Sequence, residues 1–255
     1  MRWCANFFAM QRLISSFILL LASPTFAAEP PLPVEQRTAM LAEFKAQVAT
    51  LTKAIEAAPR EAELYSQRGD RHLFLGRFAD AVVDFEKMIA LDPAHDAPHW
   101  RLGIAYYFAG QFAKSARQFE KYHAHDGRDR ENGIWKFLGD AKTSALDQAR
   151  RTMLVYTRFD REPFPTLYEM FAGKKTTAEL LADLKARNLA DSPRVMFFAN
   201  YYAGLNEELH GRHAEALALL HKSVANPWGR TAEGGPAYMW QVARLHYEAL
   251  AAGKP

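Results

Sequence analysis

The histidines are the residues of this sequence with the most obvious capacity for chemistry, because several of them lie close together. The close pairs are His95 and His99, His123 and His125, and His210 and His213. Imidazole nitrogens bind zinc, but a zinc site needs three or four ligands, and no pair has a third ligand at a convincing spacing. We therefore expect these histidines in loops and at helix caps, with no bound metal and no other cofactor.

Motifs of the common enzyme classes do not occur in the chain. G-x-x-x-x-G-K-[ST], H-E-x-x-H and G-x-S-x-G are all missing. Asp160, Glu162 and Asp183 are carboxylates near one segment, and such groups serve in acid–base catalysis, but the sequence identifies no partners for them. The sequence predicts that the chain is not an enzyme and has no catalytic residues. A metal-dependent enzyme with an undetected site is an alternative.

A 34-residue repeat organises the middle of the chain. The matching pairs are Gly69 and Gly103, Gly76 and Gly110, Phe78 and Phe112, and Phe85 and Phe119. A glycine within a helix lets a second helix approach closely, and a glycine between helices turns the chain by adopting a positive φ. The repeat therefore predicts two helix hairpins, over residues 62–95 and 96–129.

This pattern resembles the tetratricopeptide repeat (TPR), whose period is 34 residues. The resemblance implies an all-α solenoid of helix hairpins, because one hairpin cannot bury its apolar face without a neighbour. We expect a TPR-like domain over 62–251, preceded by an N-terminal helix within 29–61. Its later parts are a degenerate repeat (132–156), a helical insert (157–187), a late repeat (193–227) and a closing helix (236–252).

The first residues of the chain resemble a secretory signal peptide. Residues 13–22 form an apolar run preceded by Arg12 and followed by small residues up to Ala28. The run is shorter than the roughly 20 residues that span a bilayer. We therefore expect a cleaved signal over 1–28, export to the periplasm, cell envelope or medium, and no transmembrane segment afterwards. Translation from Met1 or Met10, and an uncleaved anchor helix, stay open.

The N-terminal helix carries an apolar stripe. Leu41, Phe44, Val48, Leu51 and Ile55 follow an alternating spacing of three and four residues, which places them on one helix face. Such a stripe either packs on the first repeat or joins two copies of the chain. Two heptads do not distinguish intramolecular packing from a homodimer.

The chain is also similar to the NlpI-like TPR proteins of bacterial envelopes. The resemblance covers most of residues 35–251 and is carried by segments 160–184 and 197–224. It implies a non-enzymatic adaptor that holds peptidoglycan hydrolases and proteases together, often as a dimer anchored through a lipidated cysteine. The chain departs from the family here, because its single cysteine, Cys4, precedes the apolar run instead of following it.

A concave groove is the expected binding surface, because the first helix of each repeat faces it. The positions expected to line it are Ser66, Asp70, Phe74, Trp100, Ile104, Tyr107, Phe108, Lys136 and Asp140. Large aromatic side chains are typical anchors for a bound peptide or helix. The alternative is that the insert or the N-terminal helix folds into the groove. Ser66 and Asp70 are not the Lys and Asn of a carboxylate clamp, which argues against chaperone-tail recognition.

The composition is that of an ordinary globular protein. The chain has 255 residues, 49% hydrophobic and 24% charged, with a formal net charge of only +3. So small an excess of positive charge gives no support for nucleic-acid binding. The sequence therefore predicts an exported scaffold or adaptor that binds a protein or peptide, with a self-associating envelope protein as an alternative.

Overall fold

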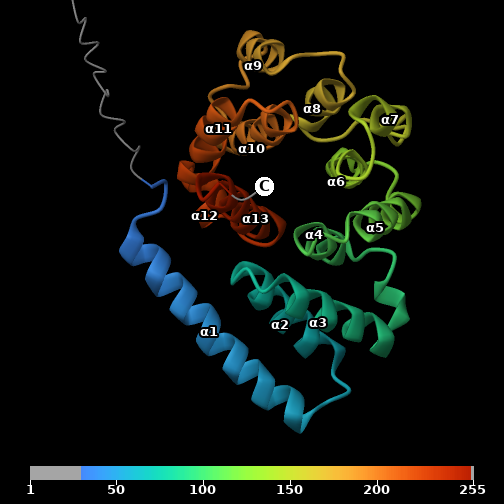
Figure 1. Ribbon diagram of the computed structural model, residues 1–255, viewed down its shortest axis with the longest axis vertical. Coiled ribbons are helices and arrows are strands. Elements are labelled where there is room, and N and C mark those ends of the chain that lie inside the picture. Colours follow the sequence, from blue (N-terminus) through green and yellow to red (C-terminus); the bar gives the residue numbers. More distant parts are fainter. Residues whose placement is uncertain (1–29, 254–255) are drawn as a thin grey trace, which may run out of the picture.

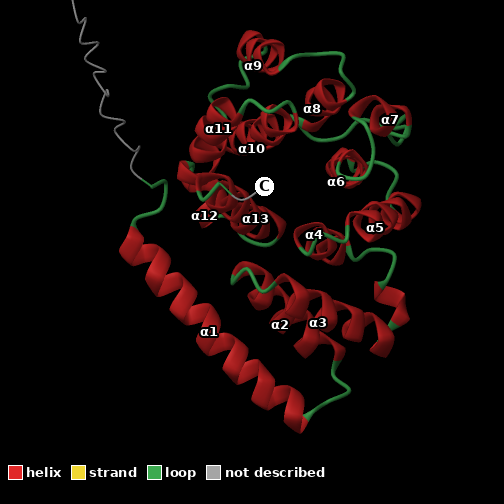
Figure 2. Cartoon of the chain, in the orientation of Figure 1, coloured by secondary structure: helices red, strands yellow, loops and turns green. Residues whose placement is uncertain are grey.

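The computed structural model describes residues 30–253, and this part of the chain consists of helices joined by loops, with no strand (Figure 2). Its α-helices are α1 (Val34–Ala57), α2 (Ala62–Phe74), α3 (Phe78–Leu91), α4 (Trp100–Phe108), α5 (Phe112–His125), α6 (Arg130–Ala141), α7 (Leu146–Arg151), α8 (Phe164–Phe171), α9 (Thr177–Ala186), α10 (Pro193–Leu209), α11 (His213–Ala225), α12 (Pro227–Thr231) and α13 (Gly235–Ala251). A short 3₁₀ helix spans Pro93–His95. The all-α prediction is confirmed. The predicted signal peptide, residues 1–28, and Cys4 lie outside the described residues.

Consecutive helices pack in hairpins, as the repeat predicts. The closest pairs include α2 with α3, α4 with α5, and α10 with α11. Figure 1 shows these pairs following one another along an arc, from α2 and α3 to α10 and α11. Gly76, Gly110 and Gly211 adopt positive φ angles of 74°, 73° and 72° where the chain turns between paired helices.

In each of the two repeated hairpins, a glycine on the first helix packs against a phenylalanine on the second helix. A Cβ atom added to Gly103 would lie only 2.7 Å from the ring of Phe119, and one added to Gly69 would lie 2.7 Å from the ring of Phe85. Both rings are fully buried. The 34-residue spacing of these residues thus reflects one packing contact that occurs twice.

The closing helix α13 lies inside the arc (Figure 1). Its Tyr238 ring packs on Phe74 and Trp100, with centroids 4.9 and 4.8 Å apart, and its His246 ring lies 4.5 Å from that of Phe108. The sequence predicted that these aromatic residues line an open groove, with a groove covered by the insert or the N-terminal helix as the alternative, but α13 covers most of them. The insert helices α8 and α9 pack instead on α6 and α10.

The long helix α1 packs along α2 and reaches α13 with its first turns. The Phe44 ring lies 5.4 Å from that of Phe74, and Val48 and Ile55 are buried. Arg37 donates two hydrogen bonds of 2.7 Å to the carboxylate of Glu248 on α13. Much of the apolar stripe therefore has partners within this chain.

Within residues 30–253, none of the helices combines the length and the hydropathy needed to cross a membrane.

Candidate functional site

A cleft of about 280 Å³ opens at the N-terminal end of α13. Five aromatic side chains line it, Trp100, Tyr122, Trp135, Phe198 and Trp228. They come from α4, α5, α6, α10 and α12, so that helices far apart in the sequence build one wall. We call this the Glu131 cleft, after a buried carboxyl group in its lining.

Five polar side chains also line the Glu131 cleft. They are Asp129, Glu131, Asn132, Arg161 and Arg194. Three of them belong to the start of α6, where the side chain of Asp129 accepts a 3.0 Å hydrogen bond from the backbone N–H of Glu131 and so caps the helix. Arg161 comes from the loop between α7 and α8, and Arg194 from the first turn of α10.

Arg161 is the centre of an ionic cluster. Its guanidinium lies 3.2 Å from a carboxylate oxygen of Asp129 and 3.2 Å from one of Asp160, and it also donates to Glu131. The same group lies over the ring of Phe164, 4.2 Å from the centroid. One cation is thus shared among three carboxylates.

The remaining oxygen of Glu131 is held from the core. The hydroxyl of Tyr202 donates a 2.6 Å hydrogen bond to it, and Trp135 Nε1 donates a 3.1 Å bond to that hydroxyl. Trp135 and Tyr202 are almost completely buried. These bonds fix the orientation of Glu131 and couple it to the wall of the cleft.

The pKa of Glu131 is raised to about 7, chiefly by burial. The negative charges of Asp129 and Asp160 contribute to the rise, whereas the positive charge of Arg161 and the hydrogen bond from the Tyr202 hydroxyl oppose it. Burial also raises the pKa of Asp129. The cleft therefore contains a carboxyl group that gains or loses a proton near neutral pH.

Two polar side chains of the cleft have hydrogen-bonding capacity to spare. Asn132 is only 5% exposed, yet its side-chain amide makes no hydrogen bond to any described residue. Arg194 has no ion pair within residues 30–253, and its one hydrogen bond is a 3.2 Å bond to the carbonyl oxygen of Glu162. Both side chains line the cleft and are therefore able to donate hydrogen bonds to a ligand there.

The structure places the nine predicted groove residues in several different environments. Trp100 lines the Glu131 cleft. Tyr107 and Phe108 line a second cavity at the other end of α13. Phe74 and Ile104 are buried in the core. The five residues thus lie on the side that α13 covers or in the core beneath it.

The four polar residues of the predicted groove are paired with each other or with neighbouring helices. Arg101 donates to Ser66, at 2.8 Å, and to Asp70, at 2.6 Å. Lys136 is buried and contacts Asp140, at 2.6 Å, and the carbonyl oxygen of Thr152. None of these four side chains lines the Glu131 cleft or the second cavity.

Sequence reasoning did not identify Glu131, Arg161, Arg194 or Trp228 as site residues. They lie in different helices and loops, and no motif of fixed spacing joins them. The feature that distinguishes Glu131 is the burial of a charged residue at the start of a helix. This burial can be recognised only once the fold is known.

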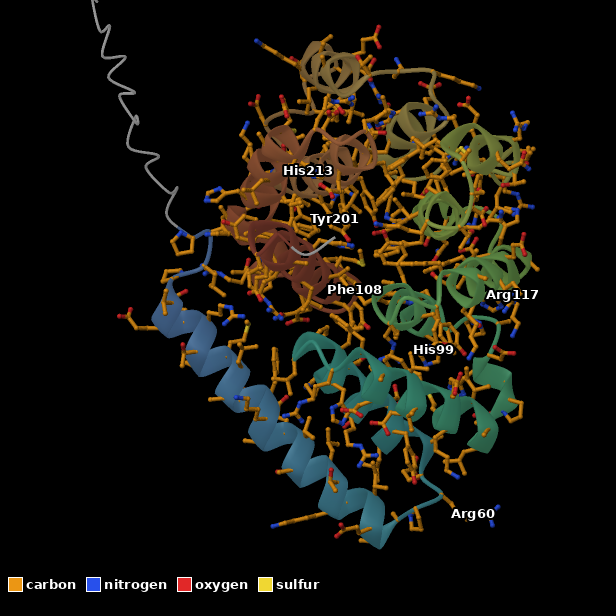
Figure 3. All side chains as sticks on the ribbon, viewed as in Figure 1. Arg60, His99, Phe108, Arg117, Tyr201 and His213 are labelled. Atoms are coloured by element: carbon orange, nitrogen blue, oxygen red, sulfur yellow. The ribbon has the colours of Figure 1, made fainter. Side chains whose placement is uncertain are left out.

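Two histidines from the close pairs make contacts within the fold. His99 is buried at the start of α4, accepts a 3.0 Å hydrogen bond from the backbone N–H of Leu102, and has its pKa lowered to about 3, chiefly by burial. His213 contacts Glu208. Figure 3 shows His99 and His213 far apart, near α4 and α11. In the described part of the chain, no group of three or more potential ligands could hold a metal.

Comparison of the chain with protein-family models and with curated proteins found no match.

Proposed function

We propose that this protein is a non-enzymatic adaptor that binds a segment of a partner protein in the Glu131 cleft. The aromatic lining of the cleft, together with the Asn132 amide and the Arg194 guanidinium, which makes no ion pair with a described residue, supports this proposal above all other features. Binding pockets are mostly apolar and contain a few well-placed polar groups. A partner's apolar side chain would pack among the aromatic rings, with its backbone or an acidic group contacting Asn132 and Arg194.

We further propose that the chain is a TPR-type solenoid and that it works in the cell envelope after export. The order of the hairpins and the repeated contacts of Gly69 with Phe85 and Gly103 with Phe119 support the first part. The signal-like residues 1–28 support the second. The similarity to NlpI-like adaptors suggests envelope hydrolases or proteases as partners.

Substitution of Trp100 by Ala is expected to weaken partner binding about 30-fold or more. Buried aromatic anchors of this kind contribute about 2 kcal/mol or more to an interface. The full chain, tagged, is used to capture partners from an envelope fraction, and each captured protein is then titrated in purified form. The readout is the dissociation constant of wild type and variant.

Two further variants separate binding from folding. Arg194→Gln loses no ion pair within the described residues and is expected to weaken binding about tenfold through loss of one charge-assisted contact. Phe159→Ala removes an aromatic ring that is 76% exposed and lies outside the cleft, and should leave binding unchanged. Equal affinity of wild type, Trp100→Ala and Arg194→Gln would contradict the proposal.

A further inference from the structure

The five aromatic residues of the Glu131 cleft differ in exposure. Trp135 and Phe198 are buried, whereas Trp100, Tyr122 and Trp228 are half-buried and keep part of their surface accessible. A ligand in the cleft can therefore contact three aromatic side chains that come from three different helices, α4, α5 and α12.

The two half-buried tryptophans are held in position by other aromatic rings. Trp100 packs edge-on against Tyr238 of α13, with the ring centroids 4.8 Å apart. Trp228 packs edge-on against Phe198 of α10, with the centroids 5.9 Å apart. Rings that are fixed before binding lose little conformational entropy when a ligand contacts them.

The polar groups of the half-buried aromatic residues are unused. Trp100 Nε1, Trp228 Nε1 and the Tyr122 hydroxyl make no hydrogen bond to a described residue. These atoms are not fully buried, so each is accessible to a ligand. Together with the Asn132 amide and the Arg194 guanidinium, they give the cleft a set of unused hydrogen-bond donors.

The carboxylates of the cleft, by contrast, are already engaged as acceptors. Asp129 accepts hydrogen bonds from the backbone N–H of Glu131 and from Arg161. Glu131 accepts hydrogen bonds from Tyr202 and from Arg161. The unused polar groups of the cleft are thus mainly donors, and the complementary ligand offers carbonyl oxygens and few N–H groups.

The backbone of a proline-rich segment has this combination of groups. Proline has a carbonyl oxygen but no N–H, and the polyproline II conformation leaves its carbonyls free of internal hydrogen bonds. An α-helix uses most of its carbonyls internally, and a strand of other residues brings one N–H for each carbonyl. Aromatic grooves are a recurring recognition mode for proline-rich segments, because the polyproline II helix is already formed before binding.

We propose that the Glu131 cleft binds a proline-rich segment in the polyproline II conformation. This inference rests on the proposed function, since it specifies the class of partner segment that the cleft takes. Proline rings pack on Trp100, Tyr122 and Trp228. The carbonyl oxygens of the segment accept hydrogen bonds from the two indole N–H groups and from the Asn132 amide.

Calorimetric titration of the full chain with blocked octaproline tests the class of ligand. We expect saturable binding to the wild-type protein. A blocked peptide of the same length with alternating proline and alanine restores an N–H at every second residue, and it should bind about fivefold more weakly. Failure of octaproline to bind, or equal binding of the two peptides, would overturn the proposal.

Conservative substitutions test the location. Trp100→Phe and Trp228→Phe each keep a ring and remove an indole N–H, so each should weaken octaproline binding about fivefold. Trp240→Phe is the matched control, because Trp240 lies outside the cleft and its Nε1 donates to the carbonyl oxygen of Val224. The control should lower thermal stability and leave octaproline affinity unchanged. Octaproline affinity that neither cleft variant changes would place the peptide elsewhere and contradict the proposal.

Competition separates this inference from the proposed function. We expect octaproline to displace a partner captured from the envelope fraction. A partner whose binding requires Trp100 but that octaproline does not displace would contradict the preference for proline and leave the adaptor function standing. Octaproline binding in the cleft, combined with partner binding that Trp100→Ala does not change, would contradict the adaptor function alone.

Discussion

The Arg161→Leu variant is expected to lose about 2–3 kcal/mol of unfolding free energy at pH 8. The substitution leaves Asp129, Glu131 and Asp160 close together without the cation that they share. Removing one partner of a buried ion pair typically costs about 3–5 kcal/mol. The expected loss is smaller here because the Arg161 side chain is 39% exposed and solvent screens part of the interaction.

The loss of unfolding free energy caused by Arg161→Leu should be smaller at pH 5 than at pH 8. The pKa of Glu131 is about 7 in the folded chain, against an ordinary value of 4.5, so the folded state binds this proton more tightly than the unfolded state. The stabilisation that this proton provides is complete below about pH 4.5 and disappears as the pH rises through 7. Without Arg161 the pKa of Glu131 rises further, and stability falls more steeply with pH.

Urea unfolding at pH 5 and pH 8 measures both effects. Arg158→Leu is the matched control, because Arg158 lies in the same loop, is exposed and has no ion pair with a described residue. It should change the unfolding free energy by less than about 0.5 kcal/mol at either pH. An Arg161→Leu loss of the same size at both pH values would contradict the description of the cluster.

Phe119→Ala is expected to reduce the unfolding free energy by about 3–5 kcal/mol. The ring is fully buried and fills the space beside Gly103, so its removal leaves a cavity between two helices. Gly103→Ala is destabilising in the wild-type chain, by about 1–3 kcal/mol, because its methyl group would lie 2.7 Å from that ring.

The double variant Gly103→Ala/Phe119→Ala tests the contact between the two residues more directly than either single variant. Once Phe119 is an alanine, the methyl group of Ala at position 103 meets no ring, and the higher helix propensity of alanine makes the same change neutral or stabilising. Urea unfolding of the four species of this cycle should therefore show strong non-additivity. Val83→Ala, at a 64% exposed position, provides a control with a small effect. Additive losses would rule out the direct contact of Gly103 with Phe119.

Local features of the fold were predictable from the sequence. The 34-residue spacing of Gly69 and Gly103 identified two hairpins, because one packing contact recurs with each repeat. The structure also has a capping box at Thr176 and an N-cap at Ser192, and both are formed by residues close in sequence. Each of these signals depends on residues that are close in sequence or repeat at one spacing.

The position of α13 and the composition of the cleft were not predictable in the same way. The apolar spacing along residues 236–252 indicates that the helix has a buried face, but it does not identify the surface that covers this face. Glu131 and Tyr202 are 71 residues apart, and Arg37 and Glu248 are 211 apart. Such pairings depend on how distant helices pack against each other, and no local sequence pattern predicts them.

The position of α13 also determines the order in which the chain can fold during synthesis. The hairpins of α2 with α3 and α4 with α5 use local contacts and can form as soon as they leave the ribosome. The rings of Phe74, Trp100 and Phe108 lack their α13 partners until α13 itself has been made. A nascent or truncated chain that ends before α13 therefore exposes an aromatic surface prone to aggregation, which docking of α13 then covers.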